Sequence, residues 1–179
     1  MFRKMILDGI RNDPQWRGGE YEEQPYGLVA ALYVLTFMSS IPLQWQKDAP
    51  DKDSADAFLE KRITAALDST DANDLSYQVD ASHDYEPRPN LGRIKAPLMA
   101  VNSADDQVNP PELGILEKEI RKVVKGRAVV LPISDKTMGH GSHTWAVLWK
   151  EYLESLLRES EKSLVTDSSR PWIRLLWPF

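Results

Sequence analysis

Two loops of this sequence hold an acid and a histidine that could act together in proton transfer. The first loop, residues 103–111, contains the acid pair Asp105-Asp106, and the second, residues 138–144, contains His140 between two glycines. A carboxylate that accepts a hydrogen bond from one ring nitrogen of a histidine fixes its tautomer and stabilises the imidazolium. The other ring nitrogen is then free to act as a general base. Asp106 and His140 are therefore candidate catalytic residues.

Each of these loops follows a short apolar run that predicts a buried strand. The runs cover residues 97–102 and 128–133, a helical pattern covers 111–124 between them, and a second helical pattern covers 144–161. Strand, helix and strand at this spacing imply parallel pairing through a right-handed crossover, with both strands buried on both faces. The carboxyl ends of parallel strands lie at one edge of the sheet, so we expect Asp106 and His140 to meet there.

The first 80 residues carry helical patterns instead. Helices are expected over residues 2–10, from Pro25 through a strongly apolar stretch at 28–38, over 53–67 with an N-cap at Asp53-Ser54, and over 75–79. The stretch 28–38 is shorter than the roughly 20 apolar residues of a membrane span, so we interpret it as a helix buried between other helices. The composition changes at Pro87, which divides the chain into regions 1–86 and 87–162 and a tail, 163–179.

Composition excludes several classes of partner and site. The formal net charge is -5 and the pI is about 5.3, which argues against nucleic acid as a partner. Cysteine is absent and only three histidines occur, which excludes disulfides, a thiolate nucleophile and Cys-based metal sites, and nearly excludes a His-rich metal site. Proton transfer by Asp106 and His140 implies no metal and no organic cofactor. The N-terminal residues lack an apolar run of signal-peptide length, and we expect a cytoplasmic protein.

Three segments, in order, resemble the homoserine O-acetyltransferase-like group of α/β-hydrolases. They are Asp13-Pro14-x-Trp16-x-Gly18-Gly19-x-Tyr21 with Gly27-Leu28, then Asn102-Ser103-Ala104-Asp105-Asp106-x-Val108-x-Pro110-Pro111-Glu112, and Gly139-His140. The resemblance covers residues 1 to about 160. It implies a helical lid region over 1–86, followed by the C-terminal portion of an α/β-hydrolase fold with short parallel strands and flanking helices. It also implies that Asp106 and His140 belong to a Ser-Asp-His triad that acts on a small-molecule acyl ester, with a second substrate or water as acceptor.

The sequence departs from that group in two ways. No Gly-x-Ser-x-Gly motif occurs, and the resemblance places the nucleophilic serine upstream of Met1, together with the oxyanion loop. The chain therefore resembles the second half of an enzyme, whose partner would be an N-terminal half or another copy. The transferases of the group usually carry Asp after the catalytic histidine, where it contacts the substrate amine, but here that residue is Gly141. Transfer to an acceptor and hydrolysis by water both stay open.

Several features allow more than one interpretation. Trp16, Tyr21 and Tyr26 are candidates to line the substrate pocket, although aromatic residues in such loops more often pack. Asp106 and His140, taken singly, could be an ordinary surface acid and a loop histidine. A non-catalytic interaction module is the competing function for the whole chain.

The tail is the least typical segment of the chain. Its residues 170–179 lie beyond the resemblance and are rich in large apolar side chains, as the sequence Arg-Pro-Trp-Ile-Arg-Leu-Leu-Trp-Pro-Phe shows. They could dock on the missing half, on a partner or on a membrane surface, or they could be a non-native end. A peripheral membrane protein acting through this tail and the helix at 28–38 is a third possible function.

Overall fold

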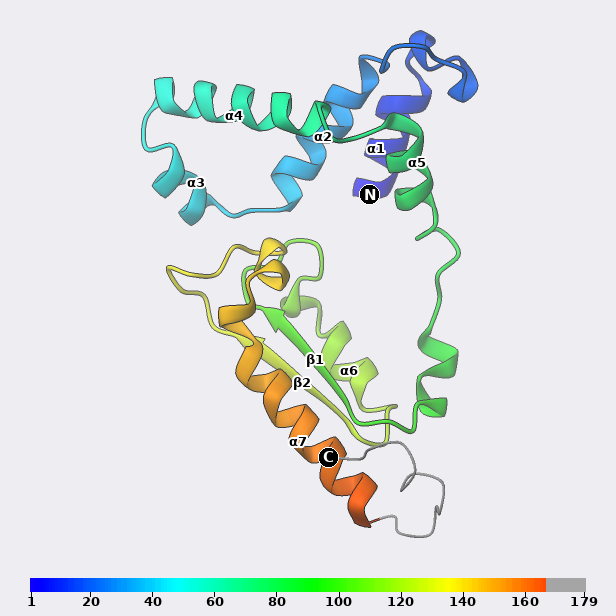
Figure 1. Cartoon of the computed structure of the whole chain (residues 1–179), viewed down its shortest axis with the longest axis vertical. Coiled ribbons are helices and arrows are strands. Elements are labelled where there is room, and N and C mark those ends of the chain that lie inside the picture. The colour runs from blue at the N-terminus through cyan, green and yellow to red at the C-terminus, as the bar shows by residue number, and fades with distance from the viewer. Residues whose placement is uncertain (167–179) are drawn as a thin grey trace, which may run out of the picture.

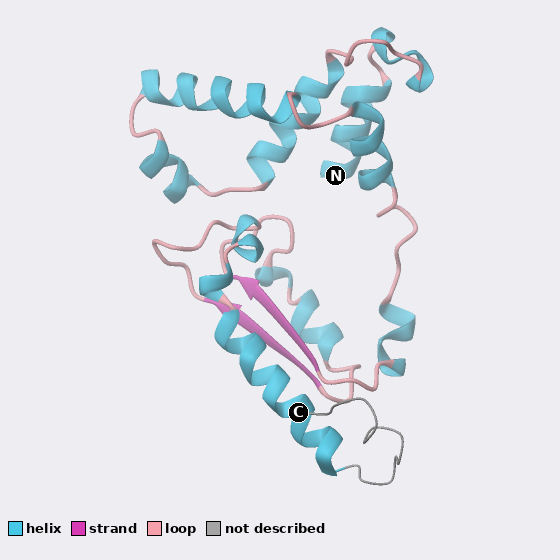
Figure 2. Ribbon diagram, in the orientation of Figure 1, coloured by secondary structure: helices cyan, strands magenta, loops and turns pink. Residues whose placement is uncertain are grey.

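The computed structural model describes residues 1–166, with side chains described through Glu161 (Figures 1 and 2). The tail segment 167–179 lies outside the described residues, so nothing tests the alternatives for it. The helices α1 to α5 form one part, here called the cap, and the strands with α6 and α7 form the other, here called the α/β part. The elements are α1 (Phe2–Arg11), α2 (Gly27–Met38), α3 (Pro42–Asp48), α4 (Lys52–Leu67), α5 (Ala72–Asp80), β1 (Leu98–Ser103), α6 (Ile115–Ile120), β2 (Gly126–Leu131) and α7 (Lys150–Thr166).

The cap contains the main apolar core of the described chain. The helices α1 and α2 cross so closely that a Cβ added at Gly27 would lie 2.1 Å from the carbonyl oxygen of Gly9. The stripe of α1 that faces this crossing is apolar, as the helical spacing in the sequence predicts. The core consists of Ile6, Ile10, Leu28, Ala31, Leu32, Ile63, Ala72 and Leu75.

The apolar helix α2 is buried along one stripe only. Leu28 and Leu32 are buried, whereas Tyr33 and Phe37 are about half exposed on the opposite side. Among the described residues, no helix alone has the length and hydropathy of a membrane span. The helices α2 and α3 meet that criterion only as a pair, and the chain bends by 105° between them.

Two helix starts in the cap show how capping defines its elements. The N-cap of α4 is Asp51, not Asp53-Ser54 as the sequence pattern suggested. Its carboxylate accepts from the Ser54 amide, while the Ser54 hydroxyl accepts from the Asp51 amide. This reciprocal pair satisfies two amides at the helix start, which favours a helix that begins after Asp51 over one capped by Asp53-Ser54. The helix α5 begins after Asp71, whose side chain accepts from the amides of Asn73 and Asp74.

The α/β part is built on two parallel strands, as predicted. The strands β1 and β2 pair from Leu98 opposite Gly126 to Ser103 opposite Leu131. The helix α6 packs on β2 and α7 packs on β1 (Figure 2). Within the described chain these are the only two strands of the sheet, so each has one unpaired edge.

The expectation that both strands are buried on both faces is wrong for this chain. Most residues of β1 and β2 are only half buried; Ser103 and Leu131 at the strand ends are buried, and Val130 is exposed. Parallel strands are normally covered by helices on both faces and by strands on both sides. The described residues supply one partner strand for each strand and two covering helices, so the cover within this part of the chain is incomplete.

Three element boundaries in the α/β part also differ from the sequence pattern. The helix expected over 111–124 is a 3-10 helix, Pro111–Leu113, followed by a turn at Gly114 and the short α6. The second strand ends at Leu131 because Pro132 has no amide to continue the ladder. The last helix starts at Lys150 instead of residue 144, since residues 141–148 form two short 3-10 helices.

Candidate acid–histidine site

The acid loop begins where β1 ends and holds Asp106 by backbone hydrogen bonds. The side chain of Asp106 is nearly inaccessible to solvent, at 4%. Its Oδ1 accepts from the amide of Val108 at 2.7 Å and from the amide of Asn109 at 3.0 Å. Asp is suited to this position because its short carboxylate can accept from amides two and three residues ahead in a tight turn.

The structure brings Asp106 and His140 together. The Oδ2 atom of Asp106 lies 3.1 Å from Nδ1 of His140, and the Asn109 amide nitrogen Nδ2 lies 3.4 Å from each of these two atoms. Burial acts to raise the pKa of Asp106, but hydrogen bonds from the Asn109 amide, His140 and the Val108 amide outweigh it and hold that pKa below its ordinary value.

The ionised acid determines the tautomer of the histidine. A carboxylate can only accept, so Nδ1 of His140 carries the proton of the hydrogen bond to Asp106. The other ring nitrogen, Nε2, is then free to accept a proton. His140 is about one-third exposed, which gives a reacting group access to that nitrogen. This arrangement can perform general acid–base catalysis.

The histidine loop fits closely against the segment between α2 and α3 of the cap. A Cβ at Gly139 would lie 2.7 Å from Cγ2 of Ile41, and a Cβ at Gly141 would lie 2.6 Å from the Ser39 carbonyl oxygen. Gly139 also has a φ of +57°, which residues with a Cβ adopt at a cost. The two glycines that flank His140 therefore allow the loop to approach the cap.

Asp105 has a separate task from its neighbour Asp106. Its two carboxylate oxygens accept from the hydroxyl of Ser103 and, at 2.7 Å, from the hydroxyl of Thr137. Ser103 and Thr137 are both buried. Asp105 thus joins the acid loop to Thr137, which directly precedes the histidine loop. In the sequence Asp105 is recognisable only as the neighbour of Asp106, because no motif connects it with Thr137.

A cavity of about 110 Å³ adjoins the acid–histidine pair. Its lining includes Asp106, Asn109, His140, His143 and Trp149. The rings of His140 and His143 are 5.0 Å apart, and Nδ1 of His143 contacts the His140 carbonyl oxygen. His143 therefore hydrogen-bonds to the backbone of the loop that carries His140. In the described part of the chain, no group of three or more His, Asp or Glu side chains is arranged to hold a metal ion.

The aromatic pocket candidates lie in the cap, away from this cavity. Trp16 donates its indole N–H to Asn73 at 2.8 Å, and the Tyr21 hydroxyl donates to Asp71 at 2.6 Å. Both side chains pack against the cap core, and Tyr26 is largely exposed. None of the three lines the cavity beside His140. Their role in a substrate pocket stays a prediction.

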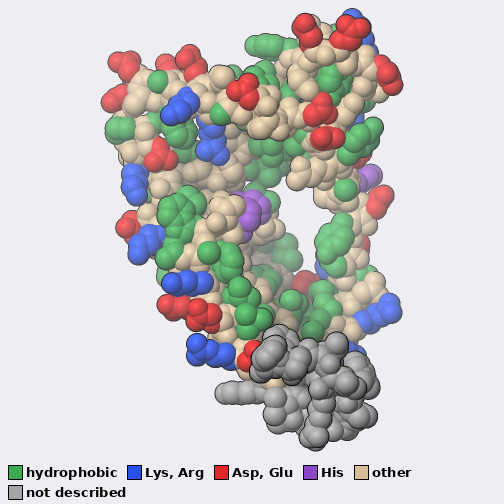
Figure 3. All heavy atoms as spheres, in the orientation of Figure 1, with side chains coloured by type: hydrophobic (Ala, Val, Ile, Leu, Met, Phe, Trp, Pro, Cys, Tyr) green, Lys and Arg blue, Asp and Glu red, His purple; other side chains and the backbone are tan. Residues whose placement is uncertain are grey.

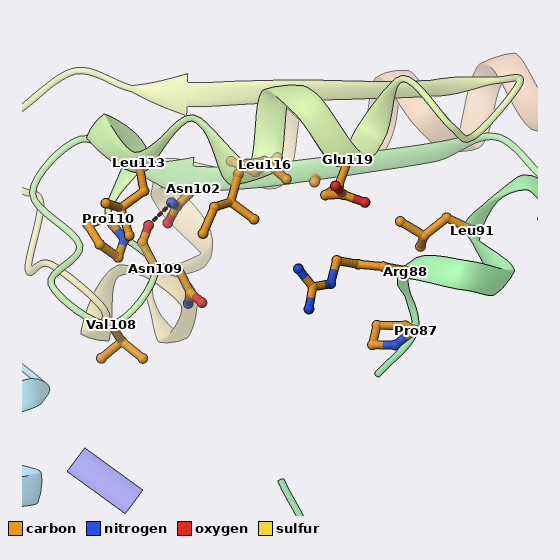
Figure 4. Close-up of a pocket in the computed structure, with 13 residues that line it drawn as sticks. Pro87, Arg88, Leu91, Asn102, Val108, Asn109, Pro110, Leu113, Leu116 and Glu119 are labelled. Atoms are coloured by element: carbon orange, nitrogen blue, oxygen red, sulfur yellow. Dashed lines mark hydrogen bonds between the residues drawn. The ribbon is translucent and has the colours of Figure 1, made fainter. Parts of the chain in front are cut away.

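A larger hollow of about 480 Å³ is lined by residues of both β1 and α6. Figure 4 shows Leu113 and Leu116 on one side of it and Leu91 with Arg88 on the other. At one end Asn102 of β1 donates to the Asn109 carbonyl oxygen at 2.7 Å, which ties the hollow to the acid loop. A second hollow, of about 230 Å³, lies on the opposite face of β1, where its lining includes Met99 and residues of α7.

Comparison with known proteins gives matches among solved structures alone. No protein-family model matches the chain, and no curated protein sequence matches it. The crystal structure of homoserine O-acetyltransferase from Bacillus anthracis superposes with a TM-score of 0.73 and 18% identity, over 87% of this chain and 48% of that one. Esterase E22 superposes with a TM-score of 0.70 and 20% identity, over 87% of this chain and 49% of the esterase. The acetyl esterase MekB superposes with a TM-score of 0.56 and 19% identity, over 90% of this chain and 48% of the esterase.

These matches define the fold. The chain spans about half the length of each of the three solved proteins. The matched portion is their C-terminal half, which accounts for the two parallel strands, the flanking helices and the incomplete cover of the sheet. At 18–20% identity the likeness carries the fold and no activity. The chain has the fold of the second half of an α/β-hydrolase, as found in a homoserine O-acetyltransferase and in esterases.

Proposed function

We propose that this chain supplies the acid and the histidine of a serine-dependent acyl-ester centre, and that a separate N-terminal half supplies the nucleophile. The observation that carries the proposal is the 3.1 Å contact between Asp106 Oδ2 and His140 Nδ1. The buried acid accepts two backbone amides on its other oxygen, so it is held ionised and in place. A surface acid and a loop histidine that met by chance would not need these supports.

In the proposed reaction, His140 moves the proton and Asp106 stabilises the charge that results. The serine Oγ of the other half attacks the acyl carbonyl carbon while its proton passes to Nε2 of His140. The tetrahedral intermediate collapses, and the leaving alcohol takes that proton. A water molecule then attacks the acyl-serine, again giving a proton to Nε2, and the serine recovers it as the acid leaves. Asp106 accepts the Nδ1 hydrogen bond throughout.

Water is the acceptor that the site favours. Within the described lining of the cavity beside His140, Asp106 is the only carboxylate, and it is already engaged. Position 141 is glycine, and the Ser39 carbonyl oxygen occupies the space that a side chain there would need. Among the described residues that line this cavity, no acidic group is therefore free to hold an acceptor's ammonium group. We accordingly propose ester hydrolysis in preference to transfer to an amino acid.

The unpaired edge of β1 is the proposed docking place for the N-terminal half. Apolar hollows flank this strand on both faces, with Ala100 lining one and Met99 lining the other. A further strand alongside β1, with apolar side chains on both faces, would fill them. The space-filling view shows an open gap between the cap and the α/β part, and histidine side chains border it (Figure 3). A nucleophile entering from the other half would have access there.

The test is to purify the chain from its native source through a C-terminal tag, and to measure its mass and its chemistry. We expect a species that contains this 20.4 kDa polypeptide together with a second half of similar size, covalently joined or associated. It should hydrolyse p-nitrophenyl acetate and react with a fluorophosphonate probe at a serine outside this sequence. Asp106→Asn should lower kcat by about 10⁴-fold, and His140→Ala should abolish triad-dependent turnover.

His83→Ala is the matched control, because His83 is a largely exposed histidine that does not line the cavity beside His140. It should keep the parental activity. If His140→Ala retained parental turnover, the proposed role of the pair would be wrong. If the purified species consisted of this chain alone and had no esterase activity, a non-catalytic interaction module would be the better interpretation.

A further inference from the structure

We infer that Gln44 of the cap is a positioning residue for His140. It fixes the conformation of the loop that carries the histidine, so the position of His140 depends on contacts with the cap. The inference rests on the proposed function for its catalytic consequence, but the contact itself can be tested without any turnover.

The carboxamide of Gln44 uses both of its N–H groups on residues 135–137, the segment that leads from β2 into the histidine loop. Its Nε2 donates to the carbonyl oxygen of Asp135 at 3.0 Å and to the carbonyl oxygen of Thr137 at 3.0 Å. Gln44 is buried although it is polar, and it lies more than 90 residues away from its acceptors in sequence. The bond to Thr137 is buried, so loss of its donor would leave a buried carbonyl unpaired at a cost, whereas Asp135 is exposed and its carbonyl could turn to water. The bond to Thr137 therefore favours one conformation of the chain that enters the loop.

The same loop is fastened on its other side to the acid loop. Thr137 is almost fully buried, and its hydroxyl lies 2.7 Å from Asp105 Oδ2 and 3.0 Å from the Ser134 carbonyl oxygen. A hydroxyl has one proton, and the charged carboxylate is the nearer and stronger acceptor. Gln44, Thr137 and Asp105 therefore form a continuous connection from the cap to the residue next to Asp106.

His140 depends on this support because its own side chain has few anchors. Its ring is about one-third exposed, and its polar ring contacts in the described structure are to Asp106 and Asn109. The loop has hydrogen bonds of its own, such as those from the Gly141 amide to the Met138 carbonyl oxygen and from the Met138 amide to the Ser142 hydroxyl, and the contacts from the cap hold this loop in place as a unit. Gln44 supplies the hydrogen bonds, while Ile41 and Ser39 supply the close packing at Gly139 and Gly141.

A carboxamide is the chemistry that this position needs. Gln44→Glu keeps the shape, but an ionised carboxylate would place an acceptor against two carbonyl acceptors. Protonation of that carboxyl restores one donor, so the defect should shrink at acidic pH. Gln44→Met keeps most of the volume and removes every donor at all pH values. A residue that only fills space would give no such pH difference between the two variants.

The first experiment uses the full chain and long-range ¹H–¹⁵N spectra of labelled histidine. The parent should show His140 in a single Nδ1–H tautomer, and Gln44→Met should show averaging between tautomers as the loop loosens. His83 is largely exposed and serves as the internal reference. Gln46→Met is the matched control, because Gln46 is on the same helix and its side chain donates, within the described structure, to the Pro50 carbonyl oxygen and not to the histidine loop. It should leave the His140 signal unchanged.

The second experiment uses the tagged species assembled with its N-terminal half. Gln44→Met should lower kcat on p-nitrophenyl acetate by about 10- to 100-fold, the loss expected from a misplacement of about 1 Å. The kcat of Gln44→Glu, relative to that of the parent, should be higher at acidic pH than at alkaline pH. The kcat of Gln46→Glu should equal that of the parent at every pH. Far-UV circular dichroism on each variant establishes that the cap is folded.

The outcomes separate this inference from the proposed function. If Gln44→Met left the His140 tautomer as it is in Gln46→Met, the positioning role would be refuted whatever the turnover. If the tautomer averaged in Gln44→Met while the parental species had no esterase activity, the coupling would stand and the proposed function would fail. Equal pH dependence of Gln44→Glu and Gln44→Met would reduce Gln44 to a packing residue.

Discussion

Replacing Gly139 by alanine should destabilise the chain more than the same change at Gly114. Both glycines have positive φ, +57° and +64°, so each substitution carries a backbone cost of about 1–2 kcal/mol. A Cβ at Gly114 would meet nothing within 4 Å, but one at Gly139 would lie 2.7 Å from Cγ2 of Ile41 and 3.1 Å from the Asp105 carbonyl oxygen. Ile41 is buried and branched at Cβ, so it cannot move aside.

The difference between the two variants isolates the contact with the cap. Overpacking of a tight site costs about 1–3 kcal/mol, so Gly139→Ala should lose about that much more free energy of unfolding than Gly114→Ala. With a urea dependence of about 2 kcal/mol per molar, the two midpoints should differ by roughly 0.5 to 1.5 M. Tryptophan fluorescence and far-UV circular dichroism, recorded at low protein concentration, would follow the unfolding.

A second substitution shows whether Ile41 is the cause. Ile41→Ala removes the Cγ2 atom that the new methyl group would strike, so Gly139→Ala should cost less in that background than in the parent. The non-additivity should be about 1–2 kcal/mol, within the range of residues in direct contact. Equal midpoints for Gly139→Ala and Gly114→Ala, or strict additivity with Ile41→Ala, would refute the close packing of the histidine loop on the cap.

Three further predictions concern the acid, the cap and the open sheet. The pKa of Asp106 lies below its ordinary value, so its ionised form stabilises the fold above that ordinary value and the benefit is lost as pH falls through the lower folded pKa. The urea midpoint of unfolding should therefore be higher for the parent than for Asp106→Asn at neutral pH, and the difference between the two midpoints should decrease at acidic pH. A difference that does not change with pH would contradict this. Gly27→Ala should cost about 3 kcal/mol in thermal or urea unfolding because its Cβ would lie 2.1 Å from the Gly9 carbonyl oxygen, whereas Gly9→Ala, with contacts of 3.5 Å, should be near neutral. The isolated chain should self-associate in sedimentation velocity through the free edge of β1, and Met99→Lys on that strand should reduce the association while Leu43→Lys on exposed α3 should not; a monomeric parent would overturn the argument.

The sequence was sufficient to predict the acid–histidine pair because each residue follows its own strand. Parallel pairing then brings the two strand ends together without any knowledge of the remaining chain. The position of Asp106 in a tight turn and of His140 between glycines are local features that a sequence displays. The parallel order of β1 and β2 follows from the same reasoning.

The contacts that support the pair could not be predicted in this way. Gln44 reaches carbonyl oxygens of Asp135 and Thr137 across about half the chain, and nothing in its local pattern distinguishes it from Gln46. The half-buried state of the strands was also missed, because an apolar run indicates what a strand would bury in a complete sheet. How much of a strand is covered depends on neighbouring strands and helices, and residues 1–166 supply only one neighbouring strand to each.

The separate core of the cap has a consequence for the order in which parts of the molecule open. Amides of α1 and α2 sit over fully buried side chains, so they should exchange with solvent deuterium only through rare cooperative opening. The strand amides have no such cover and should exchange sooner, even though strands usually are the slowest part of an α/β protein. The loop that carries His140 is bound to cap residues Ser39 to Gln44, and its protection should follow the cap. The amides around His140 would then stay protected from exchange longer than the amides of the two strands.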